Sequence, residues 1–182
     1  NRDEKYLVEL IRQQEECGAY FLDINTAICE YGELSSMLWL IKLALENSSC
    51  GIMIDSPSPE VVKEAIKLIK DRDIIINSIT LAHRINELLP TIKEYNAGIV
   101  CLSIDNDGMP HDLHKKMENA HKLAERLVNY GISADKIYID VLVEALSIDD
   151  QNGVNALSFI SQLKKELPMI KSICGLSNIS FG

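Results

Sequence analysis

The chain has 182 residues, of which 47% are hydrophobic and 25% charged, so it is long enough for one domain with a hydrophobic core. The net charge of −9 argues against nucleic-acid binding, which favours a basic surface. No apolar run approaches the roughly 20 residues of a membrane-spanning helix, and the N-terminus is polar, unlike a secretion signal. The sequence therefore predicts a cytoplasmic protein that binds neither nucleic acid nor membrane.

The cysteines and histidines do not form a metal-binding pattern. The five cysteines are odd in number and widely spaced, which fits neither a disulfide framework nor a zinc site; they are Cys17, Cys29, Cys50, Cys101 and Cys174. The four histidines fall on predicted helices or at their starts, namely His83, His111, His114 and His121. We therefore expect reduced thiols and no metal site.

Helices and short apolar strands alternate along the chain. Helices are predicted over residues 3–17, 33–47, 59–70, 83–95, from the residues after Pro110 to 130, and 152–166. Strands are predicted over 20–25, 51–55, 73–77, 98–105, 136–140 and 170–174. Ser58 is the expected N-cap of the helix that Pro59 opens, Pro90 is expected to break or kink its helix, and Gly131 is expected to stop the long helix.

This alternation predicts parallel βα units. The strands are continuously apolar, as they are when helices cover a parallel sheet. A doubly wound sheet and a (β/α)₈ barrel are the two candidate folds. No G-x-G-x-x-G motif follows the first strand, which leaves a dinucleotide fold without its usual support, and the spacing of the repeated units suits a barrel.

Each predicted strand ends in Asp or Asn. These residues are Asp23, Asn25, Asp55, Asn77, Asp105, Asp140 and Asn178. Any one of them could be a strand terminator or a helix N-cap, but in a parallel barrel all of them converge on the face where active sites lie. A mouth of carboxylates and amides without Lys or Arg is a poor phosphate site and suits a neutral heterocycle that presents N–H and C=O groups.

Six segments, in order and spread over the whole chain, match the motifs of a known family. They are Gly18–Asn25, Ile54–Pro57, Ile76–Ile79, Asp107–Pro110, Tyr138–Asp140 and Cys174–Gly182. The chain thus resembles the pterin-binding domain of methyltetrahydrofolate:corrinoid methyltransferases, which includes the folate domain of cobalamin-dependent methionine synthase. The final segment, with Asn178, is the most specific of the six.

The resemblance implies an α/β fold, a (β/α)₈ TIM barrel of the pterin-binding type. Here the barrel is expected to be incomplete, with about six βα units and the first and last strands missing, so that residues 1–182 are a single pterin-binding domain truncated at both ends. The implied pterin-binding residues are Asp55, Asn77, Asp140, Ser78, Asp23 and Asn25. Asn178 is the implied catalytic residue, in contact with the N5 region, and no metal ligand is implied.

The implied reaction moves the N5-methyl group of methyltetrahydrofolate to the Co(I) corrinoid, a cobalamin, of a partner protein. A tertiary amine leaves poorly, so a neutral Asn that hydrogen-bonds N5 would assist by positioning and electrostatics. The resemblance also implies a homodimer for the full-length form. Two alternatives stay open: a dihydropteroate synthase-like enzyme, against which the absence of basic strand ends argues, and a non-catalytic, truncated pterin-binding remnant.

Overall fold

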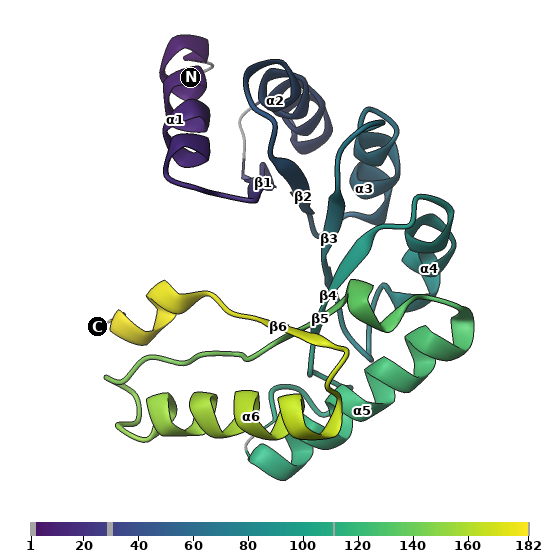
Figure 1. Cartoon of the computed structure of the whole chain (residues 1–182), viewed down its shortest axis with the longest axis vertical. Helices are drawn as coiled ribbons and strands as arrows, with labels where there is room; N and C mark the ends of the chain where they lie inside the picture. The colour runs from purple at the N-terminus through teal and green to yellow at the C-terminus, as the bar shows by residue number, and fades with distance from the viewer. Residues whose placement is uncertain (1–2, 29–30, 111, 182) are drawn as a thin grey trace. The chain divides into compact units, whose positions relative to one another are not determined.

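The structure is a computed structural model that describes residues 3–28, 31–110 and 112–181. Cys29, His111 and Gly182, which the sequence patterns above include, lie outside these ranges. The described residues form six strands and six α-helices in strict alternation (Figure 1). The chain divides into two compact units, one made of the residues up to Asn77 with Glu94–Gly98, the other of Ser78–Lys93 with the residues from Ile99 onward.

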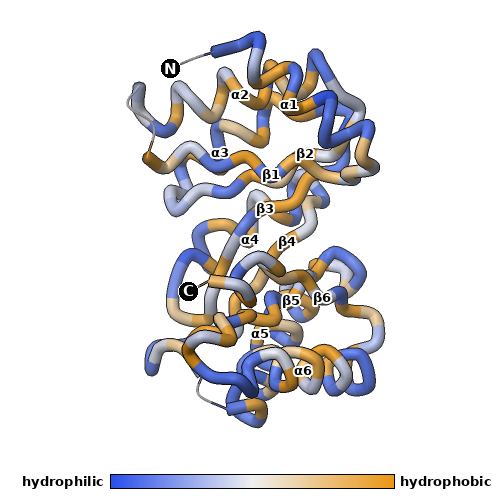
Figure 2. Tube along the Cα trace, turned by 90° about the vertical axis from the view of Figure 1, so that its left-hand side faces the viewer, coloured by the Kyte–Doolittle hydropathy of each residue, from blue (hydrophilic) through white to orange (hydrophobic). Residues whose placement is uncertain are grey.

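The first unit contains three neighbouring parallel strands with helices packed on one side. Its elements are α1 (Glu4–Glu16), β1 (Phe21–Asn25), α2 (Glu33–Asn47), β2 (Gly51–Asp55), α3 (Pro59–Ile66) and most of β3 (Ile74–Ile79). Helix α2 packs against α1, α3 and β1, and α3 packs against β2. Alternate strand residues, Ile24, Ile54 and Ile76, are fully or almost fully buried, and the strands form hydrophobic stretches of the trace (Figure 2).

The second unit repeats this architecture. Its elements are α4 (Ile85–Glu94), β4 (Gly98–Leu102), α5 (Leu113–Tyr130), the 3-10 helix η1 (Ala134–Lys136), β5 (Ile137–Asp140), α6 (Asn152–Glu166), β6 (Lys171–Ile173) and the 3-10 helix η2 (Leu176–Ser180). Strand β5 lies between β4 and β6, parallel to both. Helices α5 and α6 pack on each other and on β5 and β6, respectively, and bury Leu123, Leu127 and Phe159.

Several predicted helix ends are confirmed and two helices differ from expectation. The Ser58 hydroxyl caps α3 by accepting from the Val61 N–H at 3.4 Å, and Gly131 ends α5 at a φ of 96°. Helix α3 ends at Ile66 instead of near residue 70, because the chain tightens into turns in which Leu68 and Ile69 donate to carbonyls three residues back. Helix α4 runs on through Pro90, so Pro90 does not break the helix, one of the two predicted outcomes; the surrounding leucines and isoleucines are buried.

The strand ends differ more. Three strands end on the expected residue type, at Asn25, Asp55 and Asp140. Strand β3 continues for two residues past Asn77, and β4 stops at Leu102, so Asp105 lies in the following turn and pairs with Lys115 at 2.9 Å. The prediction that Asp105 ends a strand is therefore wrong.

Candidate functional site

Three polar side chains lie in one row across the first unit. The strand register places Asn25 beside Asp55 and Asp55 beside Asn77. Side chains alternate between the two faces of a strand, and paired residues of parallel neighbours share a face. The intervening Ile24, Ile54 and Ile76 point to the other face and are buried, whereas Asn25 is exposed and Asp55 and Asn77 are half-buried, so the row lies at the more open ends of these strands. The sequence predicted that these three residues lie close together, and the strands of the first unit place them side by side.

Hydrogen bonds fix the orientation of two members of this row. Asn25 accepts from the Ala27 N–H through Oδ1 at 3.0 Å and donates from Nδ2 to Asp55 Oδ2 at 2.8 Å. With its acceptor facing Ala27, the Asn25 amide can present only its donor to Asp55. The Asp55 carboxylate is thus pre-oriented, and its other oxygen can accept from a ligand.

Asp23 lies on the same face, two residues before Asn25. Its pKa is raised from the ordinary 3.8 to about 6: burial contributes most to the rise, the negative charge of Asp55 adds to it, and a hydrogen bond from Asn77 opposes it. The side chain is exposed by surface area, but the buried Met53 lies beside it in the strand register. The apolar neighbour limits hydration of the carboxyl, which is the physical cause of the shift. Asp23, Asp55 and Asn77 thus form one electrostatically coupled group.

The loop that follows β2 is anchored to α2. Ser56 is 1% exposed; its hydroxyl donates to Glu33 Oε1 and accepts from the Ser58 N–H at 3.1 Å. Thr26, at the end of β1, donates to the Glu33 carbonyl at 3.0 Å. Glu33 therefore ties the ends of both strands to the first turn of α2. Glu33 gives only a weak signal in the sequence, that of an acidic residue at a helix start, so it could not be singled out there.

Asp140 ends β5 in the second unit and is half-buried. Its Oδ1 accepts from the Leu142 N–H at 2.7 Å. Burial raises the pKa of Asp140, while the Leu142 N–H and the positive charge of Lys116 oppose the rise. Lys116 comes from α5 and donates to the carbonyls of Val141 and Leu142, both at 3.3 Å. A lysine therefore reaches this strand end from a helix, which the strand sequence could not indicate.

Asn178 lies in η2, a short 3-10 helix in the segment after β6, which ends at Ile173. The prediction that Asn178 stands at a strand end is therefore wrong. Its N–H donates to the Gly175 carbonyl at 3.1 Å, and its side chain folds back over the same residue. A Cβ built on Gly175 would lie 3.1 Å from Asn178 Nδ2, so glycine makes room for the amide. The loop after β5 supports η2, since Leu146 donates its N–H to the Ile179 carbonyl at 3.1 Å and Ser147 donates its hydroxyl to that of Phe181 at 2.5 Å.

Ser78 follows Asn77 in β3 and belongs to the second unit. It is half-buried, and its carbonyl accepts from Arg84 Nη1 at 2.6 Å. The structure thus places Asp23, Asn25, Asp55 and Asn77 together in the first unit. It places Ser78, Asp140 and Asn178 in the second unit.

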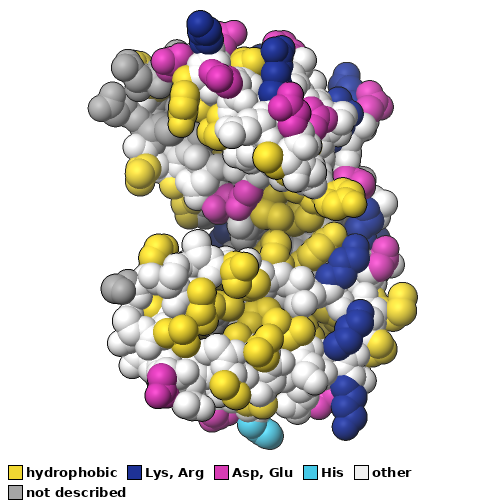
Figure 3. All heavy atoms as spheres, turned by 60° about the vertical axis from the view of Figure 1, so that its left-hand side comes forward, with side chains coloured by type: hydrophobic (Ala, Val, Ile, Leu, Met, Phe, Trp, Pro, Cys, Tyr) yellow, Lys and Arg dark blue, Asp and Glu magenta, His cyan; other side chains and the backbone are white. Residues whose placement is uncertain are grey.

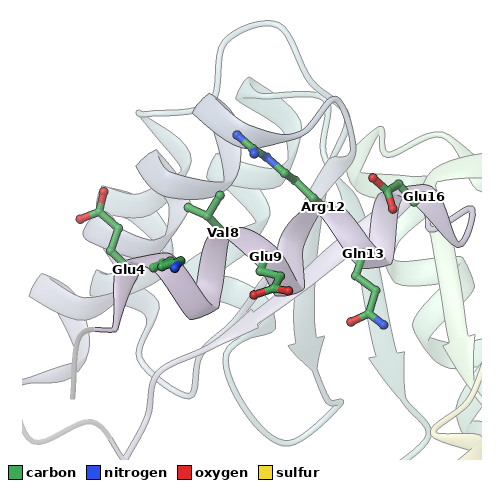
Figure 4. A pocket seen from close by; sticks show the side chains of 7 residues that line it. Glu4, Val8, Glu9, Arg12, Gln13 and Glu16 are labelled. Carbon is green, nitrogen blue, oxygen red and sulfur yellow. The ribbon is translucent and has the colours of Figure 1, made fainter.

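Other surface features do not compete with these residues. A concavity of about 860 Å³ lies along α1, where Glu4, Val8 and Arg12 point to one side of the helix and Glu9 and Gln13 point to the other (Figure 4). Hydrophobic side chains gather on one face of the second unit (Figure 3). Within the described ranges, no group of three or more His, Cys, Asp or Glu could hold a metal ion, and no described helix is long and apolar enough to cross a membrane.

Comparison with curated proteins shows two kinds of relative. A methylcorrinoid:tetrahydrofolate methyltransferase of Eubacterium limosum is 28% identical over 100% of this chain and 68% of its own length. The methionine synthase of Mycobacterium tuberculosis is 27% identical over 99% of this chain, which spans only 16% of that protein.

Comparison with solved structures shows the fold. The dihydropteroate synthase of Xanthomonas albilineans in complex with 7,8-dihydropteroate superposes on 97% of this chain and 65% of its own with a TM-score of 0.75 at 17% identity. The 7,8-dihydropteroate synthase of Vibrio fischeri covers 94% of this chain and 67% of its own with a TM-score of 0.69, also at 17% identity. This likeness confirms the predicted α/β fold of the pterin-binding type.

The family model for pterin binding enzymes matches residues 1–182. This match covers both the row of the first unit and the Asp140 and Asn178 segments of the second. The chain therefore belongs to the pterin binding enzyme family.

Proposed function

We propose that this chain is the pterin-binding part of a methyltransferase that moves the N5-methyl group of methyltetrahydrofolate to the Co(I) corrinoid of a partner protein. The observation that carries the proposal is the Asn25–Asp55–Asn77 row with Asp23 beside it. The sequence relatives named above support the methyl-transfer chemistry, because one is a methylcorrinoid:tetrahydrofolate methyltransferase and the other is a methionine synthase.

The donor set of the first unit fits a pterin. The pyrimidine edge of a pterin presents N–H donors side by side with a carbonyl acceptor, and a carboxylate accepts two such N–H bonds at once. Asp55, held by Asn25, would accept from that edge, and the Asn77 amide would read an adjacent donor or acceptor. Asp140 would supply a second carboxylate, and Ser78 would contribute at the end of β3. The polar row thus serves to bind and orient the substrate.

Asn178 is the proposed catalytic residue. Methyltetrahydrofolate supplies a methyl group on a tertiary nitrogen, which leaves only if N5 gains positive character. A neutral amide can hydrogen-bond N5 and its proton without bringing a competing charge, which stabilises the developing charge through a pre-positioned dipole. The Eubacterium limosum relative is named for transfer of the methyl group in the opposite direction, from the corrinoid to tetrahydrofolate. The same contacts serve both directions, because forward and reverse reactions share one transition state.

The test is methyl transfer between methyltetrahydrofolate and Co(I) cobalamin, followed through the absorbance change of the corrinoid. We expect transfer that disappears in Asn178→Ala while methyltetrahydrofolate still binds. Binding without transfer would support the alternative of a pterin-binding remnant. Condensation of a pterin pyrophosphate with p-aminobenzoate would support the dihydropteroate synthase alternative. The proposal would be overturned if the chain neither bound nor turned over any of these substrates.

The proposed partners follow from the same chemistry. The corrinoid is carried by a separate protein, so that protein must present its cobalt to the bound N5-methyl group. A second copy of this chain is the other proposed partner. A pull-down with a corrinoid protein, with and without methyltetrahydrofolate, and a measurement of solution mass test the two partners separately.

A further inference from the structure

Leu142 adopts a backbone conformation that leucine rarely takes. Its φ is 53°, in the left-handed region that bulky side chains enter only when their surroundings force them to. In this conformation its N–H donates to Asp140 Oδ1 at 2.7 Å. The direction in which the Asp140 carboxylate points therefore depends on an unfavourable conformation two residues further along the chain.

Lys116 contacts the peptide groups on both sides of Leu142. Its Nζ, from the first turn of α5, donates to the carbonyls of Val141 and Leu142, both at 3.3 Å. These two carbonyls flank the left-handed residue, so an ammonium that binds both fixes the peptide groups on either side of it. The ammonium group is well suited to this contact because it carries three donors.

The setting of Lys116 distinguishes it from an ordinary surface lysine. Lys116 is half-buried and lines a cavity of about 480 Å³ with Leu142 and Glu144. Burial lowers its pKa, and the charges of Glu144 and Asp140 oppose that effect. Asp112 and Asp149 also line this cavity, and the positive charge of Lys116 in turn lowers the pKa of Asp140.

The adjacent Lys115 shows that the contact is specific. Lys115 pairs with Asp105 at 2.9 Å and with Glu118 at 3.6 Å, on a different side of α5. Two neighbouring lysines on one helix thus serve different loops, and only Lys116 reaches the loop after β5.

We propose that Lys116 is a positioning residue for Asp140: by binding the Val141 and Leu142 carbonyls it holds the Leu142 N–H on the carboxylate and keeps the carboxylate ionised and aimed at the ligand. This inference rests on the proposed function for the role of Asp140 as a pterin ligand. The contacts among Lys116, Asp140, Val141 and Leu142 do not depend on that role.

The test is a pH titration of the Asp140 carboxyl carbon by ¹³C NMR, without ligand, on the whole chain. The resonance is assigned by its loss in Asp140→Asn. Lys116→Met keeps the apolar stem and removes the charge, so we expect the pKa of Asp140 to rise by about one unit. Lys116→Arg keeps the charge, so the pKa of Asp140 in this variant should stay close to its value in the unaltered chain. Lys122→Met is the matched control, because Lys122 lies on the same helix and pairs with Glu118.

An Asp140 titration in Lys116→Met that matches the Lys122→Met control would overturn the inference. If Lys116→Met does not fold, the unaltered chain decides: the ¹⁵Nζ resonance of Lys116 must shift as Asp140 titrates, and a resonance that does not respond would also overturn it. Binding of methyltetrahydrofolate at neutral pH should weaken about tenfold in Lys116→Met and recover in Lys116→Arg. The ligand-free titration decides the Lys116 inference, whereas methyl transfer by the unaltered chain decides the proposed function.

Discussion

The two units hold a strand-end carboxylate in different ways. In the first unit, Asp55 receives its hydrogen bond from the side chain of Asn25, its neighbour in the strand register. In the second unit, Asp140 receives its hydrogen bond from the backbone of Leu142, which Lys116 of α5 stabilises in turn. A register contact needs only two residues on adjacent strands, whereas the backbone contact needs an unusual loop conformation and a helix to support it.

The difference has a consequence for how each site responds to substitution. In the row of the first unit, each side chain acts directly on a neighbour, so losses should be local. In the second unit, the orientation of Asp140 passes through the loop from residue 141 to 151, which also contacts η2 through Leu146 and Ser147. Substitutions there should affect positioning more widely.

The largest effect is expected at Asp55. Asp55→Asn keeps the shape of the side chain but replaces one of its two acceptor oxygens with an N–H donor. This donor would face other donors, namely the N–H groups of the pterin edge and the Asn25 Nδ2. Loss of two hydrogen bonds to a charged group costs about 3 kcal/mol or more, so affinity for methyltetrahydrofolate should fall by about a hundredfold or more. Isothermal titration calorimetry measures this, with Asp71→Asn as the control because Asp71 is an exposed carboxylate. Equal affinities for the two variants would remove Asp55 from the binding site.

The next effect is expected at Gly175. In Gly175→Ala the added Cβ would approach Asn178 Nδ2 to 3.1 Å, which is tight enough to displace the amide. We expect methyl transfer to slow by about tenfold, since misplacement of a catalytic group is costly, with little change in affinity for methyltetrahydrofolate. Single-turnover kinetics separate the two quantities.

Gly153→Ala is the matched control for Gly175→Ala. Its Cβ would meet Leu146 and Ile179 at ordinary contact distances of 3.7 and 3.9 Å, and alanine favours the helix that Gly153 occupies. This variant should keep the transfer rate. If both variants slow transfer equally, the loss reflects η2 and its neighbours as a whole and not the position of the Asn178 amide.

The sequence could predict the row of the first unit because its signals are local. A short apolar strand that ends in a polar residue marks a position, and parallel register then brings Asn25, Asp55 and Asn77 together without further information. Asp105 had the same local signal, yet β4 stops three residues earlier and Lys115 takes the carboxylate. The pattern of apolar residues does not reveal where a strand stops pairing with its neighbour.

The sequence could not predict the support of Asp140 and Asn178. A left-handed residue is usually signalled by Gly or Asn, and Leu142 gives no such signal. Lys116 has the sequence appearance of a solvated helix residue, and its contact with residues 141 and 142 depends on how α5 packs on β5. Tertiary packing decides both features, so neither periodicity nor residue type could show them.

A smaller effect is expected at Asn25, and it tests the register contact directly. Asn25→Ala removes the donor to Asp55 Oδ2 but leaves Asp55 and its strand unchanged. The variant loses the pre-orientation and not the ligand contact, so affinity for methyltetrahydrofolate should fall by about fivefold, near 1 kcal/mol. Asn25→Asp should lower it further, because two carboxylates would then face each other. An Asn25→Asp variant that binds as well as the unaltered chain would contradict the register contact.

The smallest effect is a shift in the titration of Asp23, and it shows whether the first unit behaves as a coupled group. The carboxyl should titrate near pH 6 in the unaltered chain, as its pKa of about 6 requires. Asp55→Asn removes a negative charge and should lower that pKa, whereas Asn77→Ala removes a hydrogen bond to the ionised form and should raise it. Both shifts should be about one unit or less, since Asp23 is exposed by area. ¹³C NMR of the Asp23 carboxyl carbon measures each one.

The same shift has a definite sign for stability. A carboxyl whose folded pKa lies above its unfolded value binds its proton more tightly in the folded state, so its contribution to stability is present below the unfolded value of 3.8 and is lost as pH rises through about 6. Asp23→Asn should therefore remove part of the fall in the free energy of unfolding over this range. Urea unfolding at several pH values measures this free energy. If Asp23→Asn had the same pH dependence of stability as the unaltered chain, the pKa of Asp23 would be the same in the folded and the unfolded state. The carboxyl groups of Asp23 and Asp55 would then titrate independently of each other.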